Sequence, residues 1–215
     1  MKRSSCFFVI ASAVALIGAG CAPQASPSRS VANAFVPAAV NADQTPLAAP
    51  AEATVVLPIA NYVTNRTVKR FGQYVHDRFT GYHTGDDVEV ADKTQPVPVY
   101  AIADGKVRLV KWASGYGGVM VVAFQLGGKQ INAIYGHLKL SSVTLKVGDP
   151  VTQGQTLALL GDDRSHETDG ERKHLHFGLY EGTVLKITGY VATKTDLKAW
   201  IDPQIFFTAQ GIDMK

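Results

Sequence analysis

The chain has 215 residues, which suits one ordinary domain with additional segments and allows a substantial hydrophobic core. Hydrophobic residues make up 46% of the sequence, a share that argues against global disorder. The formal net charge of +3 lacks the clear basic excess of nucleic-acid-binding domains, so we expect no nucleic-acid partner. Because both cysteines, Cys6 and Cys21, lie near the N-terminus, the rest of the chain can form neither an internal disulfide nor a cysteine zinc site.

Residues 1–20 have the three-part layout of a secretory signal peptide. Lys2 and Arg3 form a basic start, the run from Phe7 to Ala19 is almost wholly apolar, and small residues lead to Cys21. The apolar run is shorter than the about 20 residues that a transmembrane helix needs. We therefore expect an exported protein, with an uncleaved anchor or a buried helix as the alternative interpretation.

The segment Gly18-Ala19-Gly20-Cys21 resembles the cleavage box of bacterial lipoproteins, although Gly18 stands where such signals prefer Leu. Cleavage at this box would make Cys21 the first mature residue and the site of lipid attachment. Lipidation would anchor the protein to a membrane, with its domain facing the periplasm or the cell exterior. Ordinary signal cleavage after Ala22 is the alternative and would leave a soluble periplasmic or secreted protein.

Residues 21–56 are expected to form a flexible tether, because they are rich in Ala, Pro, Ser and Val and show no regular period. Their prolines would interrupt any helix or central strand. From about Val55 the composition changes to short runs of β-forming residues separated by Gly, Pro and Asp. We predict a mainly β domain over residues 57–208.

Six runs in this domain read as strands, and their spacing favours antiparallel pairing in a sheet or sandwich over strand–helix–strand units. Asp104-Gly105 and Gly127-Gly128 are strong turn signals between them. Only Asp196–Trp200 has a helical pattern, and Asp202-Pro203 indicates a turn or the start of a helix. The predicted strands are Val97–Ala103, Gly105–Trp112, Gly118–Gln125, Gln130–His137, Thr156–Leu160 and His174–Leu179.

His174-Leu175-His176 is the sharpest local signal for chemistry, because hydrolytic zinc sites use three protein ligands, often His and Asp, and leave one position for water. Residues two apart on a strand point to the same face. Both imidazoles would then project together, while Leu175 faces the core. Taken alone, the pair is better explained as a surface feature.

The segment from His83 to Asp87 is the second candidate. Gly85 is expected to allow a tight turn, because glycine tolerates backbone angles closed to other residues. Such a turn would aim an imidazole and a carboxylate at one point. On local grounds Asp86 competes with Asp87 as the ligand, and a polar surface loop is the alternative.

The third candidate is His137, at the end of a predicted strand after Tyr135-Gly136. Ile131, Ala133, Tyr135 and His137 alternate along this strand, so His137 is expected to face the same side as the other three. A lone histidine of this kind is usually structural.

Together, and in this order, the three segments resemble the catalytic domain of the lysostaphin-like zinc endopeptidases, also called the LytM or M23 peptidase family. The resemblance covers about residues 66–206. It implies one Zn²⁺ per chain, and it favours Asp87 over Asp86, which stands where the family usually has an apolar residue. The implied zinc ligands are His83, Asp87 and His176, and the implied catalytic histidines that do not bind the metal are His137 and His174.

The resemblance implies an endopeptidase that cuts peptide stems or bridges of bacterial peptidoglycan, with zinc-activated water attacking the scissile peptide bond. The chain has no His-Glu-x-x-His helix and so lacks that glutamate base, a role that His137 and His174 would fill. One alternative is a catalytically silent module of this type that activates another wall hydrolase. Others are a carrier domain, which would need a modifiable lysine that Val147–Gly161 lacks at its tip, and a binding β-sandwich with accidental histidines.

Three further features lie outside the motifs. The segment Asp162–Lys173 is longer and more charged than the corresponding loop of the family, and it is expected to border the site. His76 and His166 match no family position, so we expect both to be surface residues.

Overall fold

The computed structural model describes residues 55–215. The predicted signal peptide, the lipidation of Cys21 and nearly all of the predicted tether lie outside the described residues. Packing is already present at the first of them, because Val55 is buried and the N–H of Val56 donates to the carbonyl of Ile102 at 2.9 Å.

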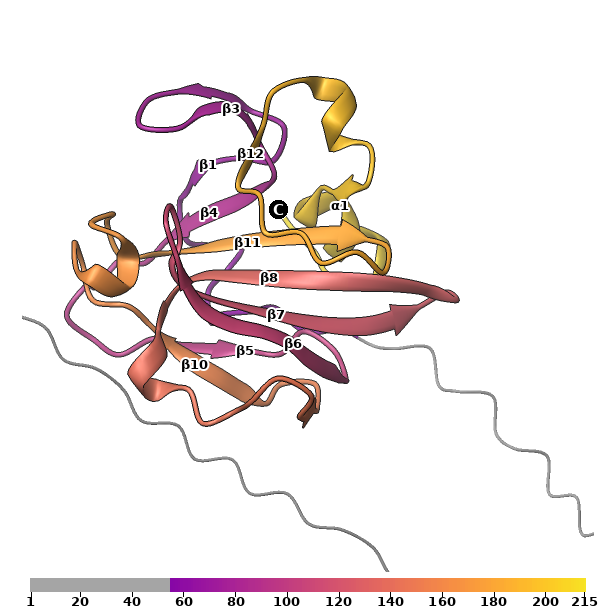
Figure 1. The fold of residues 1–215 in the computed structure, drawn as a ribbon, viewed down its shortest axis with the longest axis horizontal. Helices are drawn as coiled ribbons and strands as arrows, with labels where there is room; N and C mark the ends of the chain where they lie inside the picture. The colour runs from indigo at the N-terminus through magenta and orange to yellow at the C-terminus, as the bar shows by residue number, and fades with distance from the viewer. Residues whose placement is uncertain (1–54) are drawn as a thin grey trace, which may run out of the picture. The chain divides into compact units, whose positions relative to one another are not determined.

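A ten-stranded sheet is the framework of residues 55–215 (Figure 1). Its main path runs β1-β4-β11-β8-β7-β6-β9, and the pairings in it are antiparallel. The four long strands are β6 (Gly105–Ala113), β7 (Gly117–Leu126), β8 (Lys129–Lys139) and β11 (His174–Glu181). The shorter strands are β1 (Thr67–Lys69), β4 (Gly85–Glu89), β5 (Pro98–Tyr100), β9 (Pro150–Val151), β10 (Thr156–Leu160) and β13 (Trp200–Ile201).

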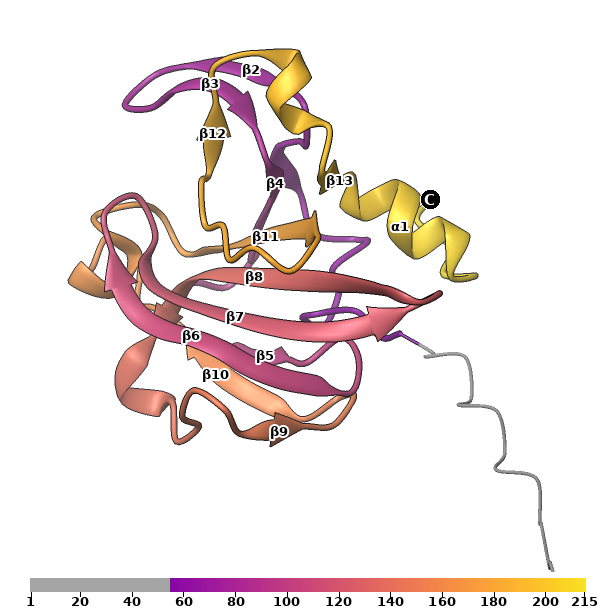
Figure 2. The same cartoon turned by 45° about the vertical axis from the view of Figure 1, so that its right-hand side comes forward.

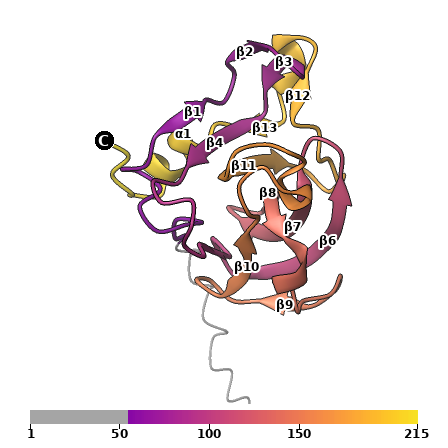
Figure 3. The same cartoon turned by 90° about the vertical axis from the view of Figure 1, so that its left-hand side faces the viewer.

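This sheet curls on itself, as Figures 2 and 3 show. β10 pairs with β5 and also with the end of β8, where Leu160 lies opposite Leu138. The main hydrophobic core fills the inside of the curl. Strand β11 contributes Leu175, Phe177 and Leu179 to it, and the exposed fraction of each is 0%. The residues between them on β11 therefore face the other side of the sheet.

A small three-stranded sheet lies beside β4 and β11 and is drawn above them in Figure 1. Its order is β12 (Tyr190–Val191), β3 (Thr80–His83) and β2 (Tyr74–His76). Only Thr84 separates β3 from β4, so the chain passes from the small sheet to the main sheet at this residue. His83 thus lies at the junction of the two sheets.

The helix α1 (Pro203–Ala209) begins where Asp202-Pro203 predicted a turn or a helix start. The carboxylate of Asp202 accepts hydrogen bonds from the N–H groups of Gln204 and Ile205, which is the usual role of an N-terminal cap. No helix in the described part of the chain is both long and apolar enough to cross a membrane. Short 3₁₀ turns occur at Leu140–Ser142, His166–Thr168 and Lys194–Leu197.

The mainly β, antiparallel prediction is confirmed. Five of the six predicted strands are present with shifts of at most two residues at an end, and the sixth, Val97–Ala103, is shortened to β5 (Pro98–Tyr100). The helical pattern at Asp196–Trp200 is wrong in extent. A 3₁₀ turn capped by Thr193 ends at Leu197, and Trp200 is drawn into β13 by its pairing with Tyr180 on β11.

Candidate metal and catalytic site

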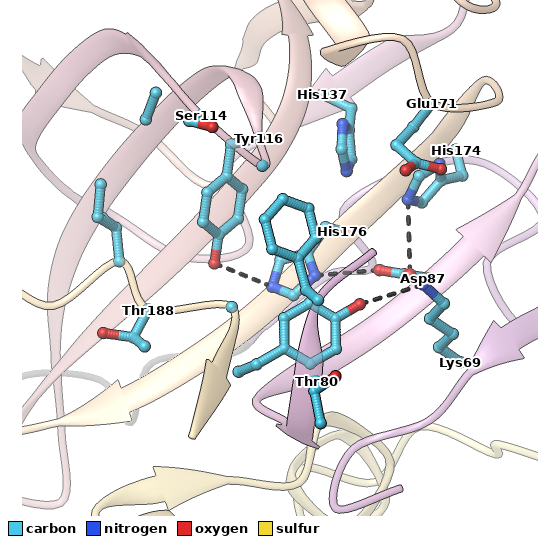
Figure 4. Close-up of a pocket in the computed structure, with 16 residues that line it drawn as sticks. Lys69, Thr80, Asp87, Ser114, Tyr116, His137, Glu171, His174, His176 and Thr188 are labelled. Atoms are coloured by element: carbon cyan, nitrogen blue, oxygen red, sulfur yellow. Dashed lines mark hydrogen bonds and ion pairs between the residues drawn. The ribbon is translucent and has the colours of Figure 1, made fainter. Parts of the chain in front are cut away.

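A cavity of about 470 Å³ lies where the main sheet meets the small sheet (Figure 4). Its lining comes from β1, β3, β4, β8 and β11, from the β2–β3 turn, from the end of β6 and the β6–β7 turn, and from Glu171 and residues 187–190. Of the five residues that the resemblance singled out, four line it: Asp87, His137, His174 and His176. The fifth, His83, is fully buried and does not line the cavity, but its Nε2 contacts Asp87 and His176.

His83, Asp87 and His176 converge on one point. The register of β4 and β11 places Asp87 directly opposite His176. His176 Nδ1 lies 3.0 Å from Asp87 Oδ1 and 3.1 Å from His83 Nε2. The distance from His83 Nε2 to Asp87 Oδ1 is 3.3 Å. Three side chains from two sheets thus present one ligand atom each to a common centre.

This triangle fits a zinc ion. Zinc–nitrogen and zinc–oxygen bonds of about 2.0–2.1 Å in a tetrahedron place neighbouring ligand atoms about 3.3 Å apart. The edges of the triangle are 3.0–3.3 Å, and the donors are two imidazoles and one carboxylate. A set of three protein ligands of this kind would leave one zinc position for water.

Asp86 points away from the cluster. Its Oδ1 accepts a hydrogen bond from the N–H of Phe71 at 2.9 Å, and its Oδ2 accepts one from Gln204 Nε2 at 3.4 Å. Adjacent residues of a strand face opposite sides, so Asp86 and Asp87 cannot both reach the cavity. Burial raises the pKa of Asp86 to about 6, with Asp202 adding to the effect.

The cluster holds the Asp87 carboxylate ionised and the His176 imidazole neutral. Burial alone would raise the pKa of Asp87, but its electrostatic interactions with His174 and His83 and its contacts with the rings of His174 and His176 hold it well below its ordinary value. Burial lowers the pKa of His176 to about 4, against the opposing effect of Asp87. An ionised Asp87 and a neutral His176 are in the protonation states that metal ligands need.

His137 and His174 form a second pair beside this cluster, with ring centroids 4.2 Å apart. His174 Nδ1 donates to the carbonyl of Arg172 at 2.6 Å, which orients the ring and directs Nε2 to Asp87 Oδ2, 3.6 Å away. Burial lowers the pKa of His137 well below its ordinary value, and the neighbouring His174 adds to this effect. His137 is therefore neutral near pH 7.

As predicted, His174 and His176 share one face of β11 while Leu175 enters the core on the other. The prediction for His137 is wrong, because Ala133 and Tyr135 face the core whereas His137 lines the cavity.

A bulge in β8 explains the error. Gly118 pairs with Leu138 and Val119 with Gly136, so His137 is the extra residue between two successive pairs. Its φ is +61°, a left-handed conformation in which histidine is more frequent than most residues. Such a bulge breaks the two-residue alternation and turns the imidazole to the opposite face.

Gly85 is also required for a reason other than the expected one. It has no positive φ and makes no turn, because it is the first residue of β4. A Cβ atom at this position would lie 2.3 Å from the carbonyl oxygen of Phe177 on β11. Glycine is needed here so that the two strands can approach closely enough to bring Asp87 and His176 together.

Three cavity residues were missed by the sequence reasoning. The hydroxyl of Tyr116 lies 3.4 Å from His176 Nε2, the ring nitrogen that faces away from the cluster. Lys69 Nζ donates to the hydroxyl of Tyr190 at 3.1 Å, and the Tyr190 ring packs 5.0 Å from that of His83. Of these three residues, only Tyr116 has a local sequence signal for its position. It lies between Gly115 and Gly117, and glycines mark turns.

The segment Asp162–Lys173 borders the cavity as expected, because Glu171 lines it. His76 and His166 are exposed, which confirms that they are surface residues. His166 stacks on Trp112 with ring centroids 5.1 Å apart.

A buried His–Asp–His cluster open to a cavity on one side, within an antiparallel β domain, is typical of a zinc hydrolase. Residues 81–187 match the model of peptidase family M23, and the chain belongs to this family through that domain.

Two curated relatives and one solved structure are similar to it. The murein hydrolase activator EnvC of Escherichia coli (strain K12) is 35% identical over 101 residues, which cover 46% of this chain and 21% of that protein. Endolysin 2638A of Staphylococcus phage 2638A is 32% identical over 105 residues, 48% of this chain and 20% of the endolysin. The match thus spans about a fifth of each curated relative. The structure of LytU shares 27% identity and a TM-score of 0.50, covering 67% of this chain and 86% of LytU.

Proposed function

We propose that this protein is an exported, zinc-dependent endopeptidase that hydrolyses peptide stems or bridges of peptidoglycan. The observation that carries the proposal is the pairing of two clusters in one cavity. His83, Asp87 and His176 converge with the spacing of a three-ligand metal site, and His137 and His174 lie beside them without joining the triangle. Membership of family M23 and the similarity to an endolysin support the choice of peptidoglycan.

In this proposal His83, Asp87 and His176 hold one Zn²⁺. When bound, zinc supplies a Lewis acid that polarises the scissile carbonyl and makes water acidic enough to react near neutral pH. The two oxygens of the Asp87 carboxylate face different partners, one the proposed metal ligands and the other a proposed catalytic histidine. Oδ1 faces His83 and His176, and Oδ2 faces His174.

His137 and His174 are the proposed acid and base. His137 is kept neutral by burial, and its Nδ1 is buried without a hydrogen-bond partner within residues 55–215. His174 is held by the carbonyl of Arg172 and presents Nε2 to the cavity side of Asp87. One imidazole removes the proton from the attacking water, and the other protonates the leaving amine or donates to the oxyanion.

A catalytically silent module that activates another wall hydrolase is the second candidate. The 35% identity to a murein hydrolase activator favours it. The complete set of five polar side chains, four lining the cavity and His83 buried against them, favours the enzyme, since a module that only binds a partner has no need of buried histidines beside a buried carboxylate.

Export and anchoring are proposed on the sequence alone. Removal of residues 1–20 and lipidation of Cys21 would place the domain at a membrane surface, on the periplasmic or outer side, at the end of a tether. A wall hydrolase needs this location to reach its substrate.

Digestion of purified sacculi by the purified protein tests the enzyme against the activator. The enzyme should release new peptide amino groups, a chelator should stop the release, and added Zn²⁺ should restore it. Release of reducing sugar would indicate a glycosidase instead. If the protein released nothing alone but increased the action of another wall hydrolase, the silent module would be the correct reading.

A further inference from the structure

Three segments of the cavity rim meet at one carboxylate. Arg78, in the turn between β2 and β3, donates from Nη1 to the carbonyl of Asp169 at 2.7 Å and from Nη2 to Asp169 Oδ2 at 2.8 Å. The N–H of Gly115, in the β6–β7 turn, donates to the same Oδ2 at 2.7 Å. Asp169 belongs to the charged loop that follows the 3₁₀ turn His166–Thr168.

Phe79 reinforces this junction on the side of the cavity. Its ring stacks on Tyr190 with centroids 5.9 Å apart and planes at 19°. It also packs against Gly115, where an added Cβ would lie 3.2 Å from Phe79 Cζ. Phe79, Gly115 and Glu171 all line the cavity that holds the histidines. The junction of Arg78 and Asp169 therefore bridges two walls of that cavity.

The bridge is weak enough to open without unfolding the domain. The Arg78 side chain is 48% exposed and that of Asp169 15%, and Arg78 also lies 3.8 Å from Glu171; ion pairs screened by solvent on one side change an equilibrium by roughly fivefold. The base of the hairpin is held separately, because β3 pairs with β12 at His83 and Tyr190. Opening would thus move the β2–β3 turn and leave His83 in place.

The bridge matters because the two forms of a wall peptide differ in their free ends. A loose stem peptide has an end that can enter a bridged cavity lengthwise. A crosslink in an intact sacculus is joined to glycan on both sides, so it has no end to thread and must be laid into the cleft from the side. A bridge across the rim blocks only the second route.

We propose that the contact of Arg78 with Asp169 is a latch that sets substrate size: when it is closed the site admits loose stem peptides, and when it is open the site admits crosslinks in intact sacculi. This proposal rests on the proposed peptidase function. It assigns Arg78 and Asp169 a role in selecting the substrate, and neither touches the reacting atoms.

The test compares hydrolysis of a soluble stem peptide with hydrolysis of intact sacculi, using the full-length protein. R78E places two acidic groups against each other, and D169N removes the charge while keeping a residue that tolerates the φ of +51° at this position. K129E is the matched control. It also replaces a cation with Glu, but it breaks the exposed ion pair of Lys129 with Glu181, at the end of β8 far from His137. Hydrogen exchange of residues 77–80 reports opening independently of activity.

R78E and D169N should each raise the ratio of sacculus to peptide hydrolysis by about fivefold, and residues 77–80 should exchange faster. The double variant should change the ratio no more than either single one, because both remove the same ion pair. K129E should leave both readouts unchanged.

The latch would be refuted by an unchanged ratio in R78E and D169N, by an equal effect of K129E, or by unchanged exchange at residues 77–80. If the wild-type protein hydrolysed neither substrate, the proposed peptidase function would fail and the substrate role of the latch with it. Peptide hydrolysis with an unchanged ratio would refute the latch alone.

Discussion

Replacing His174 and His176 one at a time with Ala should separate catalysis from metal binding at two positions on the same face of β11. His176 Nδ1 lies within 3.1 Å of both other members of the triangle. His174 Nε2 approaches only the outer oxygen of Asp87, at 3.6 Å. The first change should remove a zinc ligand, and the second should leave the ligand set whole.

The expected effect of zinc on the melting temperature follows from the linkage between binding and folding. Zinc at 100 times its dissociation constant stabilises a folded protein by about 2.7 kcal/mol. For a domain of this size such a gain raises the melting temperature by roughly 5–11 °C. H174A should keep this zinc-dependent increase, while its activity falls by about 10²-fold or more, the scale of acid–base groups. H176A should lose both the zinc-dependent increase in melting temperature and the activity.

The assay is thermal unfolding of each variant with and without Zn²⁺, together with zinc content and sacculus hydrolysis. Comparing each variant with its own zinc-free form removes the cost of deleting a buried side chain. Loss of the zinc-dependent increase in both variants would show that His174 is a ligand. Retention in both, with zinc still bound, would show that the metal lies elsewhere.

Three other predictions test the framework and the anchor. In G85A the added Cβ would lie 2.3 Å from the carbonyl oxygen of Phe177, so calorimetry should show a loss of roughly 1–3 kcal/mol and titration a weaker zinc affinity. G127A, where nothing lies within 4 Å but the φ of +56° strains Ala, should also lose stability and yet bind zinc normally. L175A should cost about 2–5 kcal/mol in denaturant unfolding because Leu175 is fully buried, yet its folded fraction should bind zinc as well as the wild type, and weaker binding would contradict the separation of the two faces of β11. Replacing Cys21 with Ser should move the protein from the membrane to the soluble fraction, whereas an unmodified mature wild-type protein that begins at Pro23, seen by intact mass, would rule out lipidation.

The order and type of the long strands could be predicted because their signals are local. Runs of β-forming apolar residues specify β6, β7 and β8, with the turn signals Asp104-Gly105 at the start of β6 and Gly127-Gly128 between β7 and β8. The same two-residue period places His174 and His176 on one face and Leu175 on the other. Asp202-Pro203 marks the start of α1 for an equally local reason, since one carboxylate caps the first N–H groups of the helix.

The strands between residues 66 and 90 could not be predicted in this way. They are short and polar, and β4 owes its pairing to β11, which is distant in sequence. β-propensity reflects packing against such neighbours more than any preference of the backbone, so a segment like Gly85–Glu89 has no strand signal of its own.

The sequence by itself determined which residue types were available for a zinc site and, through the resemblance, which five to expect. Only the tertiary structure decided how they meet. The close approach of β4 to β11 at Gly85 brings Asp87 opposite His176, and the bulge at His137 turns that side chain out of the core face and into the cavity. The contact of Arg78 with Asp169 spans 91 positions of the chain. Pairing between distant strands, a one-residue bulge and a contact between loops depend on the packed neighbours of each residue, and a local pattern carries no information about them.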